Sequence, residues 1–226
     1  MAVATPKPKR RLTGVLRRLR RAYGRQTNKP TGSSVGELVA TILSQNTSHK
    51  NSSAGFRQLW RRFRSWPAVA NAAVGEIERA IRVSGLSQIK APRIKAILSR
   101  IRRDHPSGRL SLGFLGDMPV DQAMQYLCGL DGIGPKTAAC VLLFAFDRPV
   151  FPVDTHIHRI AIRLGLLGKA VSASRAQEEL TPLIPPRSRY EMHVLLIEHG
   201  RKTCRAITPR CEACCLADIC PSRRLP

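Results

Sequence analysis

The chain of 226 residues is strongly basic, with 38 lysines and arginines against 15 aspartates and glutamates and a formal net charge of +23. This excess favours a polyanionic partner, nucleic acid ahead of an anionic membrane surface, because neutralising phosphates releases counterions. The longest apolar run is nine residues, at 138–146, far short of the roughly 20 that span a bilayer. We therefore expect a nucleic-acid-binding protein of one or two domains, without a transmembrane helix.

Residues 1–30 form a basic segment with ten lysines and arginines and no carboxylate. Such a composition predicts a disordered beginning. A basic helix is expected over 12–23, because four apolar residues recur there at helical spacing: Leu12, Val15, Leu16 and Leu19. The segment should add non-specific affinity for nucleic acid, with a nuclear-import signal or a solvated tail as the alternatives.

From residue 34 onward, apolar residues recur with the helical period and no alternating strand pattern occurs. Ser34 and Glu37 predict a capping box that opens a helix. Pro92 and Pro119 each fit the first turn of a later helix. Further helices are expected over 136–146, 155–164, 174–183 and 188–199. The fold class predicted by this pattern is all-α.

Residues 130–138 join two expected helices through a Gly-x-Gly turn. Gly132 and Gly134 allow the backbone to turn tightly and expose its N–H groups. Pro135 pre-sets the first turn of the next helix, whose N-terminus suits a DNA phosphate next to Lys136 and Thr137. The pattern resembles a helix-hairpin-helix motif, with a plain structural turn as the alternative.

Two side chains are candidates for chemistry. Lys136 is either a phosphate contact or a nucleophile, since a helix N-terminus and a desolvated pocket both favour the neutral amine that attacks. Asp154 stands at the N-cap of the helix expected at 155–164, which is sufficient to explain an aspartate there. A return loop could bring Asp154 and Lys136 to one cleft, in which case the carboxylate would be catalytic.

Four cysteines near the C-terminus have the spacing Cys-x6-Cys-x2-Cys-x5-Cys: Cys204, Cys211, Cys214 and Cys220. Four thiolates within such a short segment can close around one metal centre and give a loop-rich tail its fold. Metal binding is expected rather than disulfides, and the spacing alone leaves zinc and iron–sulfur open. The other cysteines are expected to be a spare thiol, Cys215, and two core residues, Cys128 and Cys140.

Together, and in this order, the hairpin with Lys136, the segment around Asp154 and the cysteine spacing resemble the endonuclease III family of DNA glycosylases. The resemblance covers about 34–221. It implies two helical domains that flank a DNA-binding groove, into which the target base is flipped. It also implies a helical barrel domain at 31–148 and a cluster domain at 149–226 that part of the N-terminal segment completes. Residues 1–30, expected to be a basic arm that is partly disordered or helical, are not part of the family's common pattern.

The resemblance also implies roles for these residues. Lys136 matches the family's Schiff-base nucleophile, and Asp154 the carboxylate that stabilises the oxocarbenium charge and keeps the lysine neutral. The four cysteines match the ligands of a [4Fe-4S] cluster, with zinc as the less favoured alternative. Between the first two ligands, Arg205 and Arg210 are placed to contact phosphates, with solvation of the loop as the alternative.

Duplex contacts are implied for Gly132, Gly134, Lys136 and Thr137 of the hairpin. Leu86 occupies the position of the family's apolar wedge, with structural packing after a helix C-cap as the alternative. Gln45 and Asn46 occupy the region of the polar side chain that fills the gap. Here the sequence departs from the family, in which a small residue more often follows the glutamine, so the register between these two is open by one residue.

The function implied by the resemblance is base-excision repair by a DNA glycosylase with abasic-site β-elimination lyase activity, acting on oxidised pyrimidines. The alternatives are a thymine or uracil mismatch glycosylase, and a non-catalytic binder of damaged DNA on the same scaffold. The expected partner is double-stranded DNA with a damaged or mismatched base or an abasic site, bound by a monomer and without membrane. The expected location is the cytoplasm, at the nucleoid, in a bacterium and the nucleus in a eukaryote.

Overall fold

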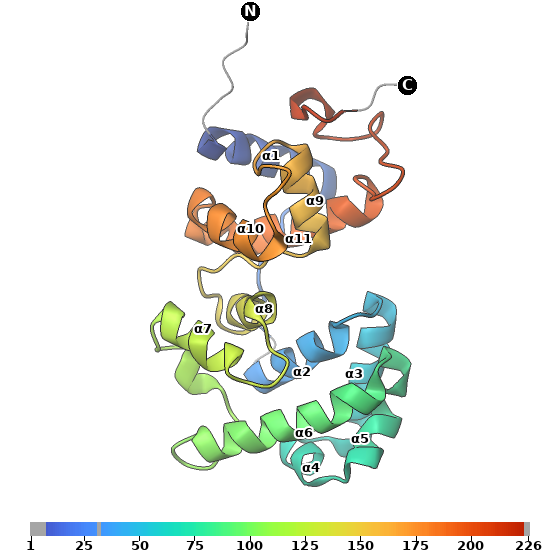
Figure 1. The fold of residues 1–226 in the computed structure, drawn as a ribbon, viewed down its shortest axis with the longest axis vertical. Coiled ribbons are helices and arrows are strands. Elements are labelled where there is room, and N and C mark those ends of the chain that lie inside the picture. The colour runs from blue at the N-terminus through green and yellow to red at the C-terminus, as the bar shows by residue number, and fades with distance from the viewer. Residues whose placement is uncertain (1–7, 31–32, 224–226) are drawn as a thin grey trace, which may run out of the picture. The chain divides into compact units, whose positions relative to one another are not determined.

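The computed structural model describes residues 8–30 and 33–223, and every regular element within those ranges is a helix (Figure 1). The prediction of an all-α fold is thereby confirmed. The beginning of the basic segment, expected to be disordered, falls on residues 1–7, outside the described residues. None of the described helices has the length and apolar character needed to cross a membrane.

The chain divides into two compact units. The terminal unit combines the residues up to Lys29 with those from Pro149 onward, and the central unit is Pro30–Arg148. The main helices of the terminal unit are α1 (Pro8–Tyr23), α9 (Thr155–Arg163), α10 (Ala173–Leu180) and α11 (Arg189–Lys202). Those of the central unit are α2 (Ser34–Ser44), α3 (His49–Phe63), α4 (Trp66–Asn71), α5 (Val74–Ile81), α6 (Ser87–Asp104), α7 (Val120–Cys128) and α8 (Pro135–Phe146).

In the central unit, α2 packs against α3, α6 and α8. The helix begins one residue earlier than the capping box predicted, because Ser33 is the N-cap and its Oγ accepts a hydrogen bond from the N–H of Gly36 at 3.0 Å. Ser34 is instead the first helical residue, and its Oγ accepts from the N–H of Leu112 at 3.3 Å. The predicted Ser34 cap is therefore wrong by one position.

The position predicted for Pro92 is also wrong. Helix α6 begins at Ser87, directly after Leu86 in the left-handed conformation, so Pro92 lies inside the helix rather than in its first turn. There the proline removes one backbone hydrogen bond. Cys128 is another correction, since it is exposed, whereas Cys140 is buried as expected.

Helices α3 and α4 were not predicted from the sequence. The buried residues of α3 are Ser52, Gly55 and Leu59, so its inner face is mostly small or polar and gives no apolar period. Small residues are needed there because the chain approaches closely: a Cβ on Gly55 would lie 2.9 Å from the Cβ of Ser84. Close packing thus replaces the hydrophobic stripe that marks the other helices.

In the terminal unit, α1 is part of the core. Its four apolar residues are at most 7% exposed and join one hydrophobic cluster with residues of α9, α10 and α11: Leu12, Val15, Leu16 and Leu19. The Arg20 guanidinium also donates to Glu191 of α11 at 2.9 Å, and this hydrogen bond lowers the pKa of Glu191. The basic segment from Pro8 to Tyr23 is therefore a folded element of this unit.

Replacing a core leucine of α1 should destabilise the terminal unit. Leu19 is 0% exposed, so Leu19→Ala should lower the free energy of unfolding by about 2–5 kcal/mol through lost burial and a residual cavity. The matched control is Arg17→Ala, on the exposed face of the same helix, which should change it by no more than about 0.5 kcal/mol. Urea denaturation followed by circular dichroism measures both, and equal effects would contradict this packing.

Candidate functional site

The hairpin between α7 and α8 presents a helix N-terminus at the surface of the central unit. Leu130 and Ile133 are 3% and 4% exposed and anchor the turn, and the N–H of Ile133 donates to the carbonyl of Leu130 at 3.1 Å. Gly132 has a φ of +67°, and Gly134 is the N-cap of α8, which starts at Pro135. The first N–H groups of a helix lack intrahelical partners, so this exposed end can bind an anion.

Lys136 and Thr137 follow in the first turn of α8 and point in different directions. Lys136 is exposed, whereas Thr137 is 6% exposed. The Thr137 Oγ1 accepts a hydrogen bond from the Gln45 side-chain amide at 3.4 Å. The side chain of Lys136 is therefore free to meet a ligand, while that of Thr137 is engaged within the fold.

Gln45 and Asn46 follow the last turn of α2. The Gln45 amide donates to the carbonyl of Gly132 at 3.2 Å, so it bridges this turn to the hairpin. Asn46 is exposed and adopts a φ of +52°, in the left-handed region. Of the two residues, Asn46 presents the freer side chain to solvent.

Leu86 protrudes from the central unit. It is 48% exposed, has a φ of +51° and precedes the first residue of α6. Positive φ is uncommon for a large apolar residue and holds the side chain in a specific direction. Ile89, one turn later, is 53% exposed, so the two residues form an exposed apolar protrusion.

Asp154 belongs to the terminal unit and caps α9. Its Oδ1 accepts a hydrogen bond from the N–H of Ile157 at 2.8 Å, and the residue is partly exposed. The N-cap predicted from the sequence is confirmed. A fixed carboxylate at a helix N-terminus is well placed to face a developing positive charge.

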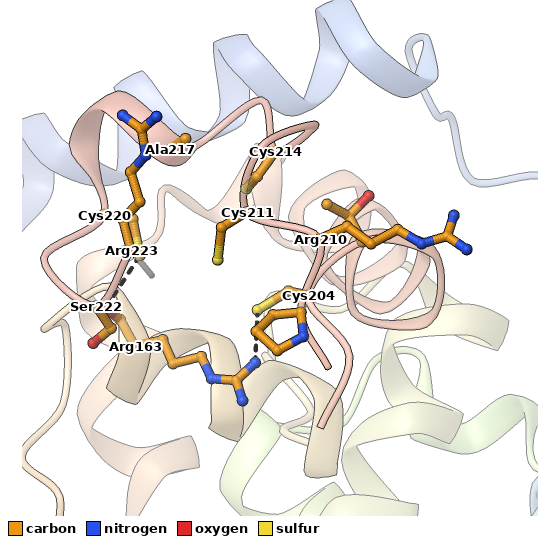
Figure 2. A pocket seen from close by; sticks show the side chains of 11 residues that line it. Arg163, Cys204, Arg210, Cys211, Cys214, Ala217, Cys220, Ser222 and Arg223 are labelled. Atoms are coloured by element: carbon orange, nitrogen blue, oxygen red, sulfur yellow. Dashed lines mark hydrogen bonds between the residues drawn. The ribbon is translucent and has the colours of Figure 1, made fainter. Parts of the chain in front are cut away.

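The cysteines Cys204, Cys211, Cys214 and Cys220 line one pocket of the terminal unit, shown in Figure 2. All seven cysteines are free thiols, so none is used in a disulfide. Arg163 donates to the Sγ of Cys204 at 3.2 Å, and the N–H of Leu216 donates to the Sγ of Cys214 at 3.4 Å. Such N–H···S contacts stabilise sulfur ligands of a metal cluster.

Burial favours the neutral thiol at two of the four cysteines of this pocket. Burial raises the pKa of Cys214 to about 11 and also raises that of Cys220. A coordinated metal deprotonates a thiol outright, so binding would reverse this preference. Within the described ranges, no three His, Cys, Asp or Glu side chains are gathered around a single ion position. The donor set, four thiols beside an arginine, has the chemistry that an iron–sulfur cluster requires.

The loop between Cys204 and Cys211 carries Arg205 and Arg210, which are both exposed. Arg163 of α9 donates to the carbonyls of Arg205 and Ala206 at 2.7 and 2.8 Å. Arg159, one turn earlier in α9, donates to the carbonyl of Cys204 at 2.8 Å. These contacts fix the loop while leaving its two arginine side chains at the surface.

Sequence reasoning missed Arg159 and Arg163. They lie four residues apart, on one side of α9, and this spacing could have indicated a shared task. It also missed His199, whose pKa is lowered to about 4 by burial. The neutral ring pairs through Nδ1 with the Tyr23 hydroxyl at 2.9 Å and lies 3.6 Å from the Sγ of Cys214.

The comparisons with known proteins agree on one family. Residues 39–186 match the HhH-GPD superfamily of base excision DNA repair proteins. A relative from Arabidopsis thaliana is 39% identical over 164 residues, which cover 73% of this chain and 55% of the relative, so the chain spans about half that protein. Endonuclease III of Sulfolobus acidocaldarius is 34% identical over 185 residues, covering 81% of this chain and 79% of the relative.

The solved structures agree with this assignment. An endonuclease III captured with DNA as a non-covalent complex matches with a TM-score of 0.79 and 26% identity, over 98% of this chain and 97% of that one. A trapped covalent intermediate of endonuclease III with DNA matches with the same values. The hairpin, the capping aspartate and the four-cysteine pocket occur within this shared fold. The chain therefore belongs to the HhH-GPD superfamily and is an endonuclease III-like DNA glycosylase of base excision repair.

Proposed function

We propose that this glycosylase is bifunctional, removing an oxidised pyrimidine from duplex DNA and then cleaving the strand at the abasic site. The observation that carries the proposal is the exposed Lys136 in the first turn of α8, directly behind the Gly132–Gly134 hairpin. A lysine at that position can also contact a phosphate, so strand cleavage is the property that separates the two roles. The trapped covalent DNA intermediate of the related endonuclease III supports the same chemistry.

In the proposed reaction, the amine of Lys136 attacks C1′ of the flipped nucleotide, and the base leaves with the bonding electrons and takes up a proton. The sugar ring opens to a protonated Schiff base. Loss of a C2′ proton then expels the 3′ phosphate, and water releases the lysine. Asp154 stabilises the positive charge that develops on the sugar as the base departs.

DNA binding in this proposal uses several exposed groups. The hairpin N–H groups and the side chains of Arg205 and Arg210 meet phosphates. Leu86 enters the stack as an apolar wedge, and a polar side chain at Gln45 or Asn46 contacts the base left without a partner. The engagement of Gln45 with Gly132 favours Asn46 for that contact.

The proposed cofactor is a [4Fe-4S] cluster held by the four cysteines of the pocket. When bound, it would cross-link four points of a loop-rich segment into one rigid unit. The chain's own contribution is the donor set and Arg163, which donates to one ligand sulfur and to two loop carbonyls. The consequence is a fixed direction for Arg205 and Arg210.

A thymine or uracil mismatch glycosylase is the second candidate. It is favoured by the turn after α2, where Asn46 takes the exposed position that family members more often give to a small residue. A different side chain facing the orphaned base changes which opposing base is accepted.

Replacing the proposed nucleophile should separate binding from strand cleavage. Lys136→Gln should abolish nicking of a duplex with an abasic site, because an amide cannot form a Schiff base. Affinity for the same duplex should fall less than about tenfold, the loss of one phosphate contact. Gel-based cleavage and fluorescence anisotropy measure the two, and undiminished nicking would refute the proposed role of Lys136.

The proposed role of Asp154 can be tested without damaging the fold. Asp154→Asn keeps an N-cap, since asparagine caps helices about as well as aspartate, but removes the negative charge. Base excision should slow by about 100-fold or more, with a thermal midpoint and DNA affinity close to those of the wild type. Unchanged excision in single-turnover assays would show that Asp154 is a structural cap alone.

The cluster proposal has a built-in control, because a fifth cysteine lies between the ligands. Purified protein should contain about four iron and four sulfide per chain, and Cys211→Ala should lose them. Cys215→Ala should retain both, since Cys215 does not line the four-cysteine pocket. Elemental analysis that finds stoichiometric zinc in place of iron would contradict the assignment.

A further inference from the structure

The most unusual buried group in the central unit is a charged side chain. Lys90 of α6 is 1% exposed, and it is among the largest fully buried side chains of the described residues. Its Nζ donates to the carbonyl of Leu43 at 2.8 Å and to the carbonyl of Ser84 at 2.9 Å. Burial lowers the pKa of this amine, and no carboxylate contributes to the shift. An ammonium buried without a counter-charge is costly, and an apolar residue of similar size could fill the same volume.

The two carbonyls adjoin the two turns that carry proposed DNA contacts. The carbonyl of Leu43 is in the last turn of α2, two residues before Gln45. Carbonyls at the end of a helix lack intrahelical partners, so they accept hydrogen bonds from elsewhere. The carbonyl of Ser84 ends a short 3-10 helix and is followed by Gly85 and Leu86, both with positive φ. One ammonium therefore joins the turn that carries Gln45 and Asn46 to the turn that carries Leu86.

The same helix also contacts the hairpin. Arg93, one turn after Lys90, lies 3.4 Å from the Asp131 carboxylate through its Nε. A Cβ on Gly132 would lie 2.2 Å from the Arg93 guanidinium, so the hairpin packs directly on this side chain. Helix α6 thus holds all three exposed segments of the central unit to which the proposed function assigns DNA contacts.

We propose that Lys90 is a positioning residue for lesion recognition, and that its ammonium fixes the separation between the Gln45–Asn46 turn and the Leu86 turn. This inference rests on the proposed function, in which these turns replace an extruded base from two sides. If the two turns are held in register before binding, no further conformational entropy is lost in ordering them when the base is flipped. Lys90 acts through other residues and touches no substrate.

A matched control lies on the same helix. Lys95, five residues further along α6, is partly buried, and its Nζ donates to the carbonyl of Ala72 at 2.6 Å. It therefore makes the same kind of lysine–carbonyl bond in the same unit, but to the end of α4 rather than to a turn with a proposed DNA contact. Lys90→Met removes two lysine–carbonyl bonds and Lys95→Met removes one, and only the first should alter recognition.

The test measures affinity for a duplex with a tetrahydrofuran abasic analogue and for the undamaged duplex, together with base extrusion reported by 2-aminopurine. Lys90→Met should reduce the preference for the damaged duplex at least tenfold and slow extrusion, with affinity for the undamaged duplex within twofold of wild type. Lys95→Met should leave the preference within twofold. An unchanged preference in Lys90→Met, or an equal loss in both variants, would overturn the proposal.

A second measurement does not depend on whether Lys90→Met folds. In the wild-type background, the effects of Asn46→Ala and Leu86→Ala on the preference for the damaged duplex should be coupled. If the two turns act together on the extruded base, removing either side chain already removes most of their combined contribution. The double variant should therefore lose clearly less preference for the damaged duplex than the product of the two single losses. Strictly multiplicative losses would contradict a shared register. Because the abasic analogue undergoes no lyase reaction, this result is independent of whether Lys136 forms a Schiff base.

Discussion

The N-terminus of α8 is the feature on which the central unit's proposed chemistry depends. Two buried side chains, Leu130 and Ile133, fix the hairpin that presents it, and the positive φ of Gly132 allows the chain to turn there. The exposed N–H groups at this helix end can bind a phosphate, and the exposed Lys136 follows in the first turn. In the proposed mechanism, one local geometry therefore serves both phosphate binding and nucleophilic attack.

The strong positive charge is used unevenly across the fold. Arg20 pairs with Glu191, and Arg159 and Arg163 hold the loop between Cys204 and Cys211 through its carbonyls. These arginines make structural contacts within the protein, although all of them contribute to the net charge that favours nucleic acid as a partner. Arg205 and Arg210 are exposed on that loop and are free to meet phosphates. Net charge thus identifies the class of partner but not which arginines bind it.

Much of the fold could be predicted because apolar periodicity and turn residues are local. The stripe in α1, the hairpin glycines and the Asp154 cap all follow from short-range rules. Helix α3 could not be predicted, because small residues chosen for close approach form its buried face. Lys90 was missed for a similar reason. A lysine is normally assigned to the surface, and only the fold shows that the carbonyls of Leu43 and Ser84 accept hydrogen bonds from this buried one.

The proposed lyase mechanism requires that Lys136 forms a Schiff base with damaged DNA. It is tested most directly by borohydride trapping on three duplexes, with thymine glycol, a G·T mismatch or an abasic site. We expect a covalent adduct on the thymine glycol and abasic duplexes that is absent in Lys136→Gln. An adduct on the G·T duplex in preference to thymine glycol would favour the mismatch glycosylase. No adduct on any duplex, from protein that still binds them, would contradict the lyase mechanism.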